Sequence, residues 1–194
     1  SKIDIRGELI SGKNIEIDIN VIIEGRVVLG DGVKIGANTI LINSTIGSGT
    51  IIRQFTIIEN SIIGEASIVG PFSRIRPDSV LGDNVQVGNF VELKNAKMQS
   101  NCRVNHLSYL GDSSLGANVT IGAGTITCNY DGKHTNKTTI DQGAFIGSGC
   151  NLVAPIAIGA NCTIGSGSTI TSDVPAGKLT IARSKQVVIQ NWKG

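Results

Sequence analysis

His106 is the residue of this sequence best suited to proton chemistry, because an imidazole can accept a proton near neutral pH. Tyr109 follows it by three residues, in the stretch NHLSYLGD, and favours a chemical role. Arg76 and Lys94 lie eighteen residues apart, and two cations brought side by side would suit a phosphate. Each observation also has a plain structural interpretation: a single histidine often only stabilises a fold, and spaced cations often form a solvated ladder.

A six-residue hydrophobic repeat must position these residues, and repeats of this kind indicate solenoid folds. Aliphatic side chains recur at steps of six residues, occasionally five, and Gly often follows them. The repeat is interrupted after Thr127 and resumes at Ile140. Before the interruption it is carried by Ile17, Ile23, Leu29, Ile35, Leu41, Ile46, Ile52, Ile58, Ile63, Val69, Ile75, Leu81, Val87, Leu93, Met98, Val104, Leu110, Leu115 and Ile121.

This period fits neither an amphipathic helix nor an alternating strand followed by irregular loops. It is typical of a parallel β-helix, in which three hexads complete a triangular coil of about eighteen residues. The aliphatic positions should stack inside the prism, while Gly and Asn relieve corner strain by adopting positive φ. Aromatic residues make up only 4% of the chain, in keeping with a narrow interior. The predicted fold class is therefore all-β.

The repeat also predicts the domain organisation. We expect residues 1–175 to form one β-helix domain with a protruding loop near residues 130–139. Residues 176–194 should form a C-terminal extension that packs outside the helix or across its end, because an open coil presents unpaired strand edges. The chain does not begin with Met, which suggests a fragment of a longer protein.

Repeat arithmetic places the candidate residues relative to one another. One face of the prism should carry Val104, Ile121, Ile146 and Ile164. The residues two positions later should then form a column along the helix: His106, Ala123, Ser148 and Ser166. A base followed by small side chains has the shape of a groove for an extended ligand, such as the pantetheine arm of coenzyme A. The same arithmetic places Arg76 beside Lys94 on adjacent coils.

Composition argues against several classes of partner. With a net charge of +2 and interspersed charges, the chain has no basic or acidic block for nucleic acid or a membrane surface. The stretch SKIDIRGELI carries charges where a signal peptide is apolar, and no run reaches membrane-spanning length, so we expect a soluble cytoplasmic protein. No CxxC pair occurs, and we interpret the cysteines as small buried side chains: Cys102, Cys128, Cys150 and Cys162.

The hexads resemble those of the hexapeptide-repeat acyltransferases, whose β-helices are left-handed. This handedness follows from the resemblance, since general crossover rules favour the right hand. Six motifs resemble the acetyltransferase half of the bacterial bifunctional N-acetylglucosamine-1-phosphate uridyltransferase/glucosamine-1-phosphate acetyltransferases: VGPFSRIRPDSVL, VGNFVELKNA, NHLSYLGD, IGAGTITCNYDG, FIGSGCNLVAP and TIAR. The resemblance covers nearly the whole chain. We expect the uridyltransferase half to be absent from these 194 residues.

The resemblance implies transfer of acetyl from acetyl-CoA to the amine of glucosamine 1-phosphate. The product would serve the synthesis of UDP-N-acetylglucosamine and of the cell envelope (peptidoglycan, lipopolysaccharide). His106 would be the general base, and Glu92 the carboxylate that orients its imidazole. The sugar-phosphate contacts implied by the resemblance are Arg76, Lys94, Tyr109, Thr120, Asn129 and Tyr130.

The resemblance also implies how acetyl-CoA and other subunits contribute. The acetyl-CoA contacts would be Ala123, Asn129, Tyr130, Ser148, Ser166 and Arg183, the last at the 3′-phosphate end. Backbone amides near Ala123 and Ser148 could stabilise the oxyanion. The family forms homotrimers, in which the protruding loop reaches a neighbouring subunit, and no metal is expected for acetyl transfer.

Two departures from the family pattern bear on the sugar phosphate. Thr120 stands where the family usually carries Asn, and a hydroxyl has one donor instead of an amide's two. Thr135 and Lys137 stand where the family carries two lysines, with Lys133 displaced upstream. We therefore expect a weaker or slightly rearranged sugar-phosphate pocket.

Three alternative functions remain open. One is a hexapeptide acyltransferase with a different acceptor. Another is a solenoid without catalytic function, which the fold alone does not exclude. The third is a zinc enzyme similar to the γ-class carbonic anhydrases, but these need three imidazoles and the chain has only His106 and His134.

Overall fold

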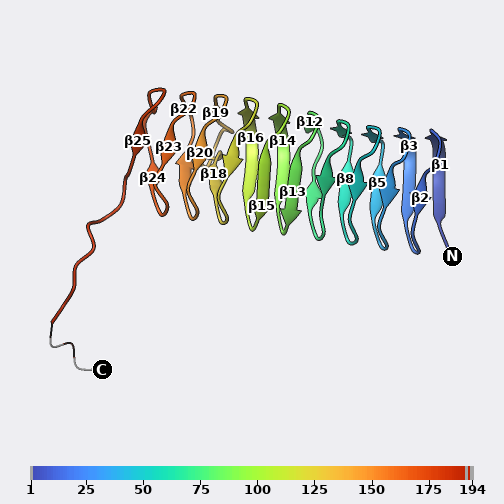
Figure 1. Ribbon diagram of the computed structural model, residues 1–194, viewed down its shortest axis with the longest axis horizontal. Coiled ribbons are helices and arrows are strands. Elements are labelled where there is room, and N and C mark those ends of the chain that lie inside the picture. Colours follow the sequence, from blue (N-terminus) through green and yellow to red (C-terminus); the bar gives the residue numbers. More distant parts are fainter. Residues whose placement is uncertain (1, 191, 193–194) are drawn as a thin grey trace.

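The structure of the protein is a computed structural model, and it describes residues 2–190 and 192. Every regular element in this part of the chain is a β-strand, from β1 (Asp4–Ser11) to β25 (Leu179–Thr180), arranged along one long axis (Figure 1). The strands pair in parallel with those of neighbouring coils, mostly between residues seventeen or eighteen apart. The predicted fold class, a left-handed parallel β-helix, is confirmed.

The prism has three faces. Four long strands continue around the corner between the first and second faces, which therefore form one fifteen-stranded sheet: β1, β3 (Ile22–Leu29), β14 (Glu92–Met98) and β16 (Tyr109–Leu115). The first face also contains β5 (Ile40–Ile42), β8 (Ile57–Glu59), β11 (Arg74–Ile75), β18 (Ile126–Cys128), β21 (Asn151–Val153) and β24 (Thr169–Ile170). The second face also contains β6 (Thr45–Ile46), β9 (Ile62–Ile63), β12 (Val80–Leu81), β19 (Thr138–Ile140) and β22 (Ile156–Ile158).

The third face is a separate ten-stranded sheet with one strand from each coil. Its strands are β2 (Glu16–Ile17), β4 (Lys34–Ile35), β7 (Ile51–Ile52), β10 (Ile68–Val69), β13 (Gln86–Asn89), β15 (Arg103–His106), β17 (Thr120–Ile121), β20 (Phe145–Ile146), β23 (Thr163–Ile164) and β25. Because each strand is so short, the position of a side chain is set by its place in the coil and by the coil above it.

The aliphatic side chains of the repeat stack inside the prism, as predicted. Val104 pairs with Ile121, and Ile121 pairs with Ile146, and none of the three is more than 4% exposed. Each such side chain contributes about 1.5–3 kcal/mol by leaving water. The cysteines are free; Cys102, Cys150 and Cys162 lie in this core as predicted, whereas Cys128 is only half-buried.

Residues with positive φ line the corners, and most are Asn or Gly, as predicted. Between the first and second faces, the corner residues have φ of 43–66°: Gly25, Asn43, Asn60, Asp78, Asn95 and Asp112. Most of the glycines that directly follow the aliphatic residues do not have positive φ and serve another purpose. At Gly36, for example, a Cβ would lie 2.6 Å from the backbone nitrogen of Gln54 on the next coil. Glycine is needed there because successive coils approach closely.

Four bulky residues occupy the corner between the third and first faces in successive coils, and we call them the corner ridge: Phe55, Phe72, Phe90 and Leu107. Their φ angles are 51–58°, a conformation that is strained for a bulky side chain. The rings of Phe55 and Phe72 stack with centroids 4.9 Å apart, and those of Phe72 and Phe90 at 5.3 Å. All four side chains are 45–64% exposed. The sequence analysis did not predict this ridge.

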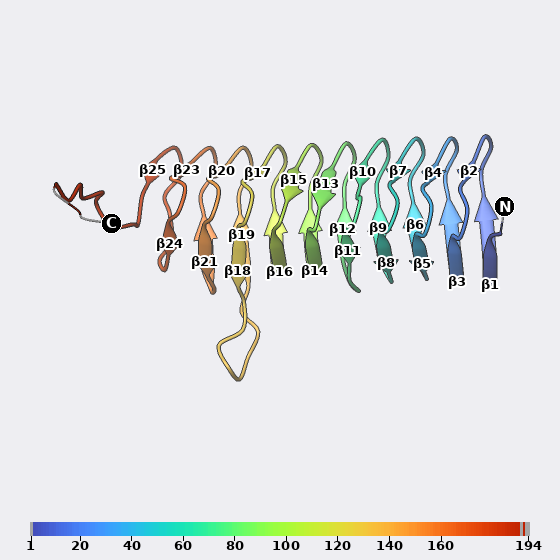
Figure 2. The same ribbon diagram turned by 90° about the horizontal axis from the view of Figure 1, so that it is seen from below.

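The interruption of the repeat is a loop, residues 129–137, that projects from the prism between β18 and β19 (Figure 2). The Asn136 backbone nitrogen donates to the Asn129 carbonyl at 2.6 Å and closes its base. At its tip, the carboxylate of Asp131 accepts hydrogen bonds from the backbone nitrogens of Lys133 and His134, at 2.9 and 2.7 Å. Backbone hydrogen bonds from His134 and Lys133, and one from the Asn136 side chain, hold the pKa of Asp131 below its ordinary value.

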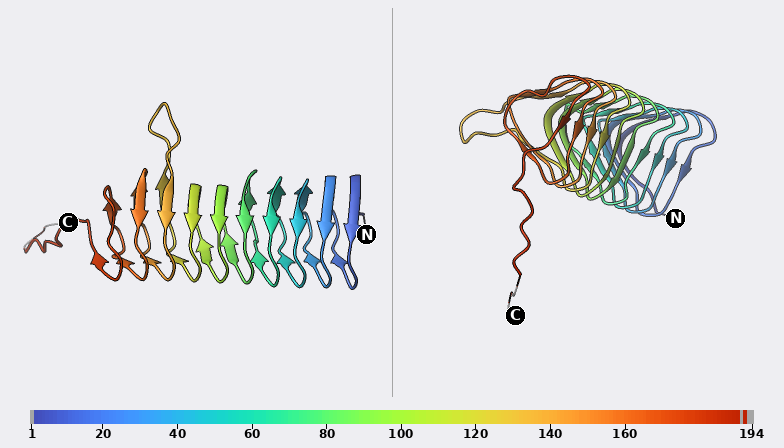
Figure 3. Two further views of the ribbon diagram at one scale, coloured as in Figure 1. Left: turned by 90° about the horizontal axis from the view of Figure 1, so that it is seen from above. Right: turned by 60° about the vertical axis from the view of Figure 1, so that its left-hand side comes forward.

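Just beyond β25 the chain still contacts the last coil, because the Thr169 backbone nitrogen donates to the Ala182 carbonyl at 3.0 Å. It then leaves the prism and runs away from it (Figure 3), and residues 181–190 are exposed. Of the expected C-terminal extension, residues 191, 193 and 194 lie outside the described part. No helix among the described residues is long and apolar enough to cross a membrane.

Candidate functional site

Arg76 and Lys94 lie on adjacent coils, as their spacing predicted. Ile75 of β11 pairs with Leu93 of β14, and the Arg76 backbone nitrogen donates to the Leu93 carbonyl at 2.8 Å. The next residue along each strand is therefore a cation. Both side chains are partly withdrawn from water, with 37% of Arg76 and 33% of Lys94 exposed. Two partly desolvated cations on a rigid face can bind a phosphate.

Each cation has a carboxylate partner in the structure. Arg76 Nη1 donates to Glu92 Oε1 at 2.9 Å, and Lys94 Nζ lies 3.6 Å from Asp112 Oδ2. Glu92 had been expected to orient the imidazole of His106. Among the described residues its carboxylate accepts a hydrogen bond from Arg76, and no hydrogen bond joins it to His106. Arg74, the register partner of Glu92 on the preceding coil, pairs instead with Glu59.

Tyr109 and Asn129 converge over Gly111, a residue that the sequence analysis did not identify. Gly111 pairs with Lys94 in the register of β14 and β16. A Cβ on Gly111 would overlap both the Tyr109 hydroxyl and the Asn129 amide nitrogen. The glycine therefore leaves the space in which these two polar groups meet, next to Lys94. The glycine at the end of the NHLSYLGD motif was the available sequence signal.

Asp112 is the second residue of the site that the sequence analysis missed. Its Oδ1 accepts a hydrogen bond from Asn95 Nδ2 at 2.9 Å, and its Oδ2 accepts one from Asn129 Nδ2 at 2.6 Å. Burial opposes ionisation of this carboxyl group, but the hydrogen bonds from Asn95 and Asn129, with the charge of Lys94, hold its pKa below the ordinary value. We call the following residues the first-face cluster: Arg76, Glu92, Lys94, Tyr109, Asp112 and Asn129.

The predicted column on the third face is present in the structure. Its strands are in the predicted register, and backbone hydrogen bonds of 2.8–3.2 Å link the column residues to the coils above them. Arg183 Nη1 donates to the Ser166 carbonyl at 2.8 Å, which places the guanidinium at the far end. The third-face column thus consists of His106, Ala123, Ser148 and Ser166, with Arg183 beyond it. It begins with an exposed imidazole and continues over small side chains.

The first-face cluster and the third-face column lie on adjoining faces, because two residues separate His106 from Tyr109 along the chain. Arg76 and Lys94 lie toward the opposite edge of the first face, next to the corner that carries Asp112. Thr120 lies elsewhere: it pairs with Arg103 and Phe145 at the opposite end of the third-face strands. Tyr130 is also apart from the cluster, because it is 64% exposed in the loop and its hydroxyl donates to the Gly132 carbonyl at 2.8 Å. A single chain therefore brings together most, but not all, of the predicted contacts.

A hollow of about 320 Å³ lies between the second face and the loop. It is lined by Asn95, Lys97, Asp112, Ser113, Ser114, Thr135, Asn136 and Lys137. Thr135 and Lys137, which stand where the family carries two lysines, therefore border the same hollow as Asp112. In the described part of the chain, no group of three or more His, Cys, Asp or Glu side chains is placed to hold a metal ion.

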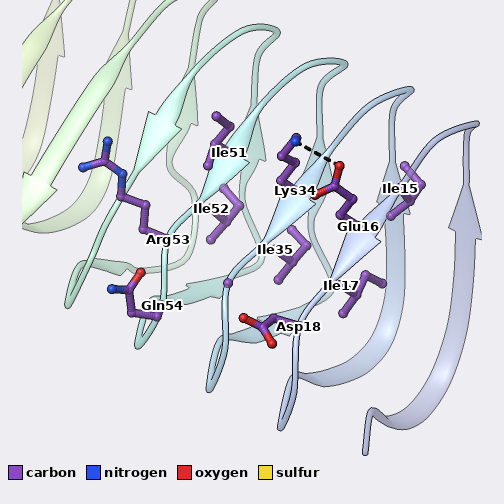
Figure 4. Close-up of a pocket in the computed structure, with 11 residues that line it drawn as sticks. Ile15, Glu16, Ile17, Asp18, Lys34, Ile35, Ile51, Ile52, Arg53 and Gln54 are labelled. Atoms are coloured by element: carbon purple, nitrogen blue, oxygen red, sulfur yellow. Dashed lines mark ion pairs between the residues drawn. The ribbon is translucent and has the colours of Figure 1, made fainter. Parts of the chain in front are cut away.

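A second hollow, of about 640 Å³, lies on the third face near the first coils, where Glu16 and Lys34 form an ion pair of 2.9 Å (Figure 4). Its walls are aliphatic and charged side chains of β2, β4 and β7, together with Arg53 and Gln54. None of the predicted site residues lines it. The size of a hollow therefore does not identify the site in this molecule.

Fold and repeat define a hexapeptide-repeat protein, and the family comparisons agree. The family model described as GMPPB C-terminal domain matches residues 5–109, more than half of the chain, and the model described as bacterial transferase hexapeptide (six repeats) matches residues 137–172. The chain therefore belongs to the hexapeptide-repeat family that the GMPPB C-terminal domain model describes.

Within that family, the chain corresponds to the C-terminal part of bifunctional GlmU proteins. It is 54% identical to bifunctional protein GlmU of Methylobacillus flagellatus over 193 residues, and 54% identical to that of Thiobacillus denitrificans over 193 residues. Each match covers 100% of this chain and 42% of the relative, so the chain spans less than half the length of these proteins.

A solved structure is also similar: the acetyltransferase domain of PglB from Neisseria gonorrhoeae in complex with acetyl coenzyme A. It matches 69% of this chain and 54% of its own, at 24% identity and a TM-score of 0.46. A likeness at this level carries no argument about function.

Proposed function

We propose that this chain transfers the acetyl group of acetyl-CoA to the amine of glucosamine 1-phosphate. The observation that carries the proposal is a pair of partly desolvated cations on a face that adjoins a column beginning at an imidazole. The whole-chain similarity to GlmU supports the choice of donor and acceptor. The products are N-acetylglucosamine 1-phosphate and CoA, and the first would serve synthesis of UDP-N-acetylglucosamine for peptidoglycan and lipopolysaccharide. A cytoplasmic location, with its pool of acetyl-CoA, is part of the proposal.

The phosphate of the sugar binds between Arg76 and Lys94 in this proposal. Both cations lie on the first face, and each is held in place by its own carboxylate partner. Binding the phosphate away from the reacting amine converts binding energy into orientation of that amine. Glu92 holds the Arg76 guanidinium before the substrate arrives. Its expected role at His106 requires the carboxylate to change partner when the phosphate engages Arg76.

The amine attacks the thioester carbonyl carbon while His106 accepts its proton. The carbon–sulfur bond then breaks and the leaving sulfur takes up the proton held by His106, so CoA leaves as the thiol and one thiol is released for each amide formed. Backbone amides beside Ala123 and Ser148 are candidates to stabilise the tetrahedral oxyanion. Proton transfer to a positioned base contributes about a hundredfold or more to the rate.

Acetyl-CoA lies along the third-face column in this proposal. Ala123, Ser148 and Ser166 present little bulk, and Arg183 at the far end meets the 3′-phosphate. Asn129, at the base of the loop, approaches the acetyl group and the sugar, and Tyr130 approaches them in the site of a neighbouring subunit. The exposed Tyr130 needs no rearrangement of the core to do so, because it belongs to the projecting loop.

A homotrimer completes the site. Thr120 and Tyr130 are proposed to contact the substrate, yet one chain keeps them away from the first-face cluster, so they would serve the site of a neighbouring subunit. The corner ridge supports association, because it exposes four large apolar side chains in a row that would otherwise remain in water. Phe72→Asn keeps a residue type that tolerates positive φ, as Asn38 does at the same corner. Light scattering should then show a smaller particle, and an unchanged mass would remove the ridge from the interface.

The acceptor is tested by measuring thiol release from acetyl-CoA with a panel of amines. Glucosamine 1-phosphate should be used far better than glucosamine, because only the phosphate engages Arg76 and Lys94. Release with serine or an acyl-carrier-protein system, and none with the amino sugar phosphate, would instead favour another hexapeptide acyltransferase. No release with any acceptor would favour a solenoid without catalytic function.

A further inference from the structure

Asp112 connects three successive coils through one carboxylate. One oxygen accepts from Asn95 on the coil before, at 2.9 Å, and the other accepts from Asn129 on the coil after, at 2.6 Å. The second oxygen also faces Lys94 Nζ at 3.6 Å. Only 15% of the Asp112 side chain is exposed, so water competes little for these contacts. The same corner carries Gly or Asn in the second to fourth coils and Asp78 in the fifth, and none of these residues contacts a predicted substrate-binding residue on both sides as Asp112 does.

The charge of Asp112 determines the orientation of the Asn129 amide. An ionised carboxylate can only accept hydrogen bonds, so Asn129 must turn its NH₂ group toward it. The amide oxygen then points to the other side. Asn129 is only 6% exposed, and among the described residues no hydrogen bond is made to that oxygen. That oxygen is not one of the fully buried, unpaired side-chain atoms of the described residues, so it stays accessible to a donor from water or from a ligand.

The space in front of this amide belongs to the site. The Asn129 amide nitrogen and the Tyr109 hydroxyl both lie over Gly111, whose strand partner is Lys94. A group that enters between Lys94 and Tyr109 therefore meets the Asn129 amide, whose oxygen has no other hydrogen bond among the described residues. The hydroxyl and amine groups of an amino sugar are donors of this kind.

We propose that Asp112 is a positioning residue: it holds Lys94 and orients Asn129 so that the amide oxygen accepts a hydrogen bond from an N–H or O–H of the acceptor substrate. This inference rests on the proposed function. Asp112 touches no substrate itself and acts through its two neighbours. The Asn129 amide oxygen would then favour a sugar that has an N–H or O–H group at this position over a sugar that lacks one.

Removal of the carboxylate tests the contact directly. Asp112→Gly suits a φ of 48°, and Gly25 already occupies the same corner in the second coil. The kcat/KM for glucosamine 1-phosphate should fall about tenfold to a hundredfold, as expected when a buried partner is lost, while the KM for acetyl-CoA changes less. The matched control is Asn95→Gly, which removes the exposed partner of Asp112 on the other side and should stay near wild-type.

Exchanging Asp112 and Asn129 distinguishes a role in orienting the amide from a role in stability alone. Asn129→Asp alone would place two carboxylates face to face and should reduce both the melting temperature and kcat/KM. The double variant Asp112→Asn with Asn129→Asp restores a donor facing an acceptor, keeps the net charge, and still offers the Asn95 amide an oxygen. Its melting temperature and its kcat/KM should both recover, the latter by about tenfold over the single variant.

Three outcomes decide the matter. A folded Asp112→Gly protein with wild-type kcat/KM, or an exchange that restores melting temperature without kcat/KM, would overturn the positioning role. An exchange that restores neither would overturn the pairing of Asp112 with Asn129 itself. Wild-type protein that is inactive with every acceptor would refute the proposed function, and the melting temperatures of the exchange would still decide the pairing.

Discussion

The first coils and the coils around residues 76–129 use the same arrangement of charges in different surroundings. In the first coils, Glu8 pairs with Arg26 and Glu16 with Lys34, and every one of these side chains is at least 52% exposed. In the later coils, Arg76 pairs with Glu92 and Lys94 with Asp112, and none is more than 38% exposed. The repeat brings opposite charges together at both places.

The difference shows that register alone does not make a site. Exposed ion pairs are screened by water and contribute about 0–1 kcal/mol. The two pairs of the first coils, which we call the first ladder, are therefore ordinary solvated contacts. The second ladder is partly desolvated and lies beside a glycine that leaves space for Tyr109 and Asn129. Partial desolvation strengthens the attraction of Arg76 and Lys94 for an anion. Four changes should sharpen or break this contrast.

His106→Ala should have the largest effect. It should lower kcat about a hundredfold or more, the usual contribution of a general base, and leave the fold intact because the side chain is exposed. The matched control is His134→Ala, which changes the chain's other histidine and keeps the backbone hydrogen bond to Asp131. Steady-state thiol release measures both. A trimeric His106→Ala protein with near wild-type kcat would contradict the assignment.

Gly111→Ala should be nearly as damaging. The added methyl group would displace the Tyr109 hydroxyl and the Asn129 amide, and a shift of about 1 Å in a positioned group can cost about a hundredfold in rate. Gly32→Asn is the control in the first coils, because φ there is +66° and nothing lies within 4 Å of a new Cβ. Comparable kcat/KM values for the two variants would show that Gly111 leaves no functional space.

Arg76→Ala and Lys94→Ala should raise the KM for glucosamine 1-phosphate about tenfold or more and change the KM for acetyl-CoA little. Each substitution removes a charged contact to the phosphate and leaves Glu92 or Asp112 without its partner. Lys34→Ala makes the same change in the exposed ladder and should have no effect. If all three variants behave alike, the later ladder is a solvated surface like the first.

Thr120→Asn should have the smallest effect, in the favourable direction. An amide offers two donors where the hydroxyl offers one, so the KM for the sugar phosphate should fall by a few-fold, about what one added hydrogen bond contributes. Thr120 lies away from the cluster in its own chain, so the improvement also requires an assembled trimer. No change in KM would place Thr120 outside the site.

The fold and the geometry of the main columns could be predicted because the hexad period maps sequence spacing onto space. Partners seventeen or eighteen residues apart do stack, which is why counting placed Arg76 beside Lys94 and His106 below Ala123. Side-chain pairing could not be predicted in the same way. Glu92 can turn toward more than one neighbour, and only the structure shows that it pairs with Arg76.

Asp112 and the corner ridge escaped prediction for a related reason. Asp, Asn and Gly all suit a corner with positive φ, so an aspartate there carries no signal of a further role, which only its contacts with Asn95 and Asn129 show. Phe is not expected at positive φ, so Phe55, Phe72 and Phe90 gave no signal of a corner. Both cases depend on contacts between coils, which no single hexad contains.

The most direct test of the central claim is analysis of the product formed from acetyl-CoA and glucosamine 1-phosphate. We predict a sugar phosphate acetylated on nitrogen, identified by proton NMR as an amide that resists hydroxylamine, with one thiol released per amide. An acetyl ester on a sugar hydroxyl, or thiol release without an acetylated sugar, would contradict the account.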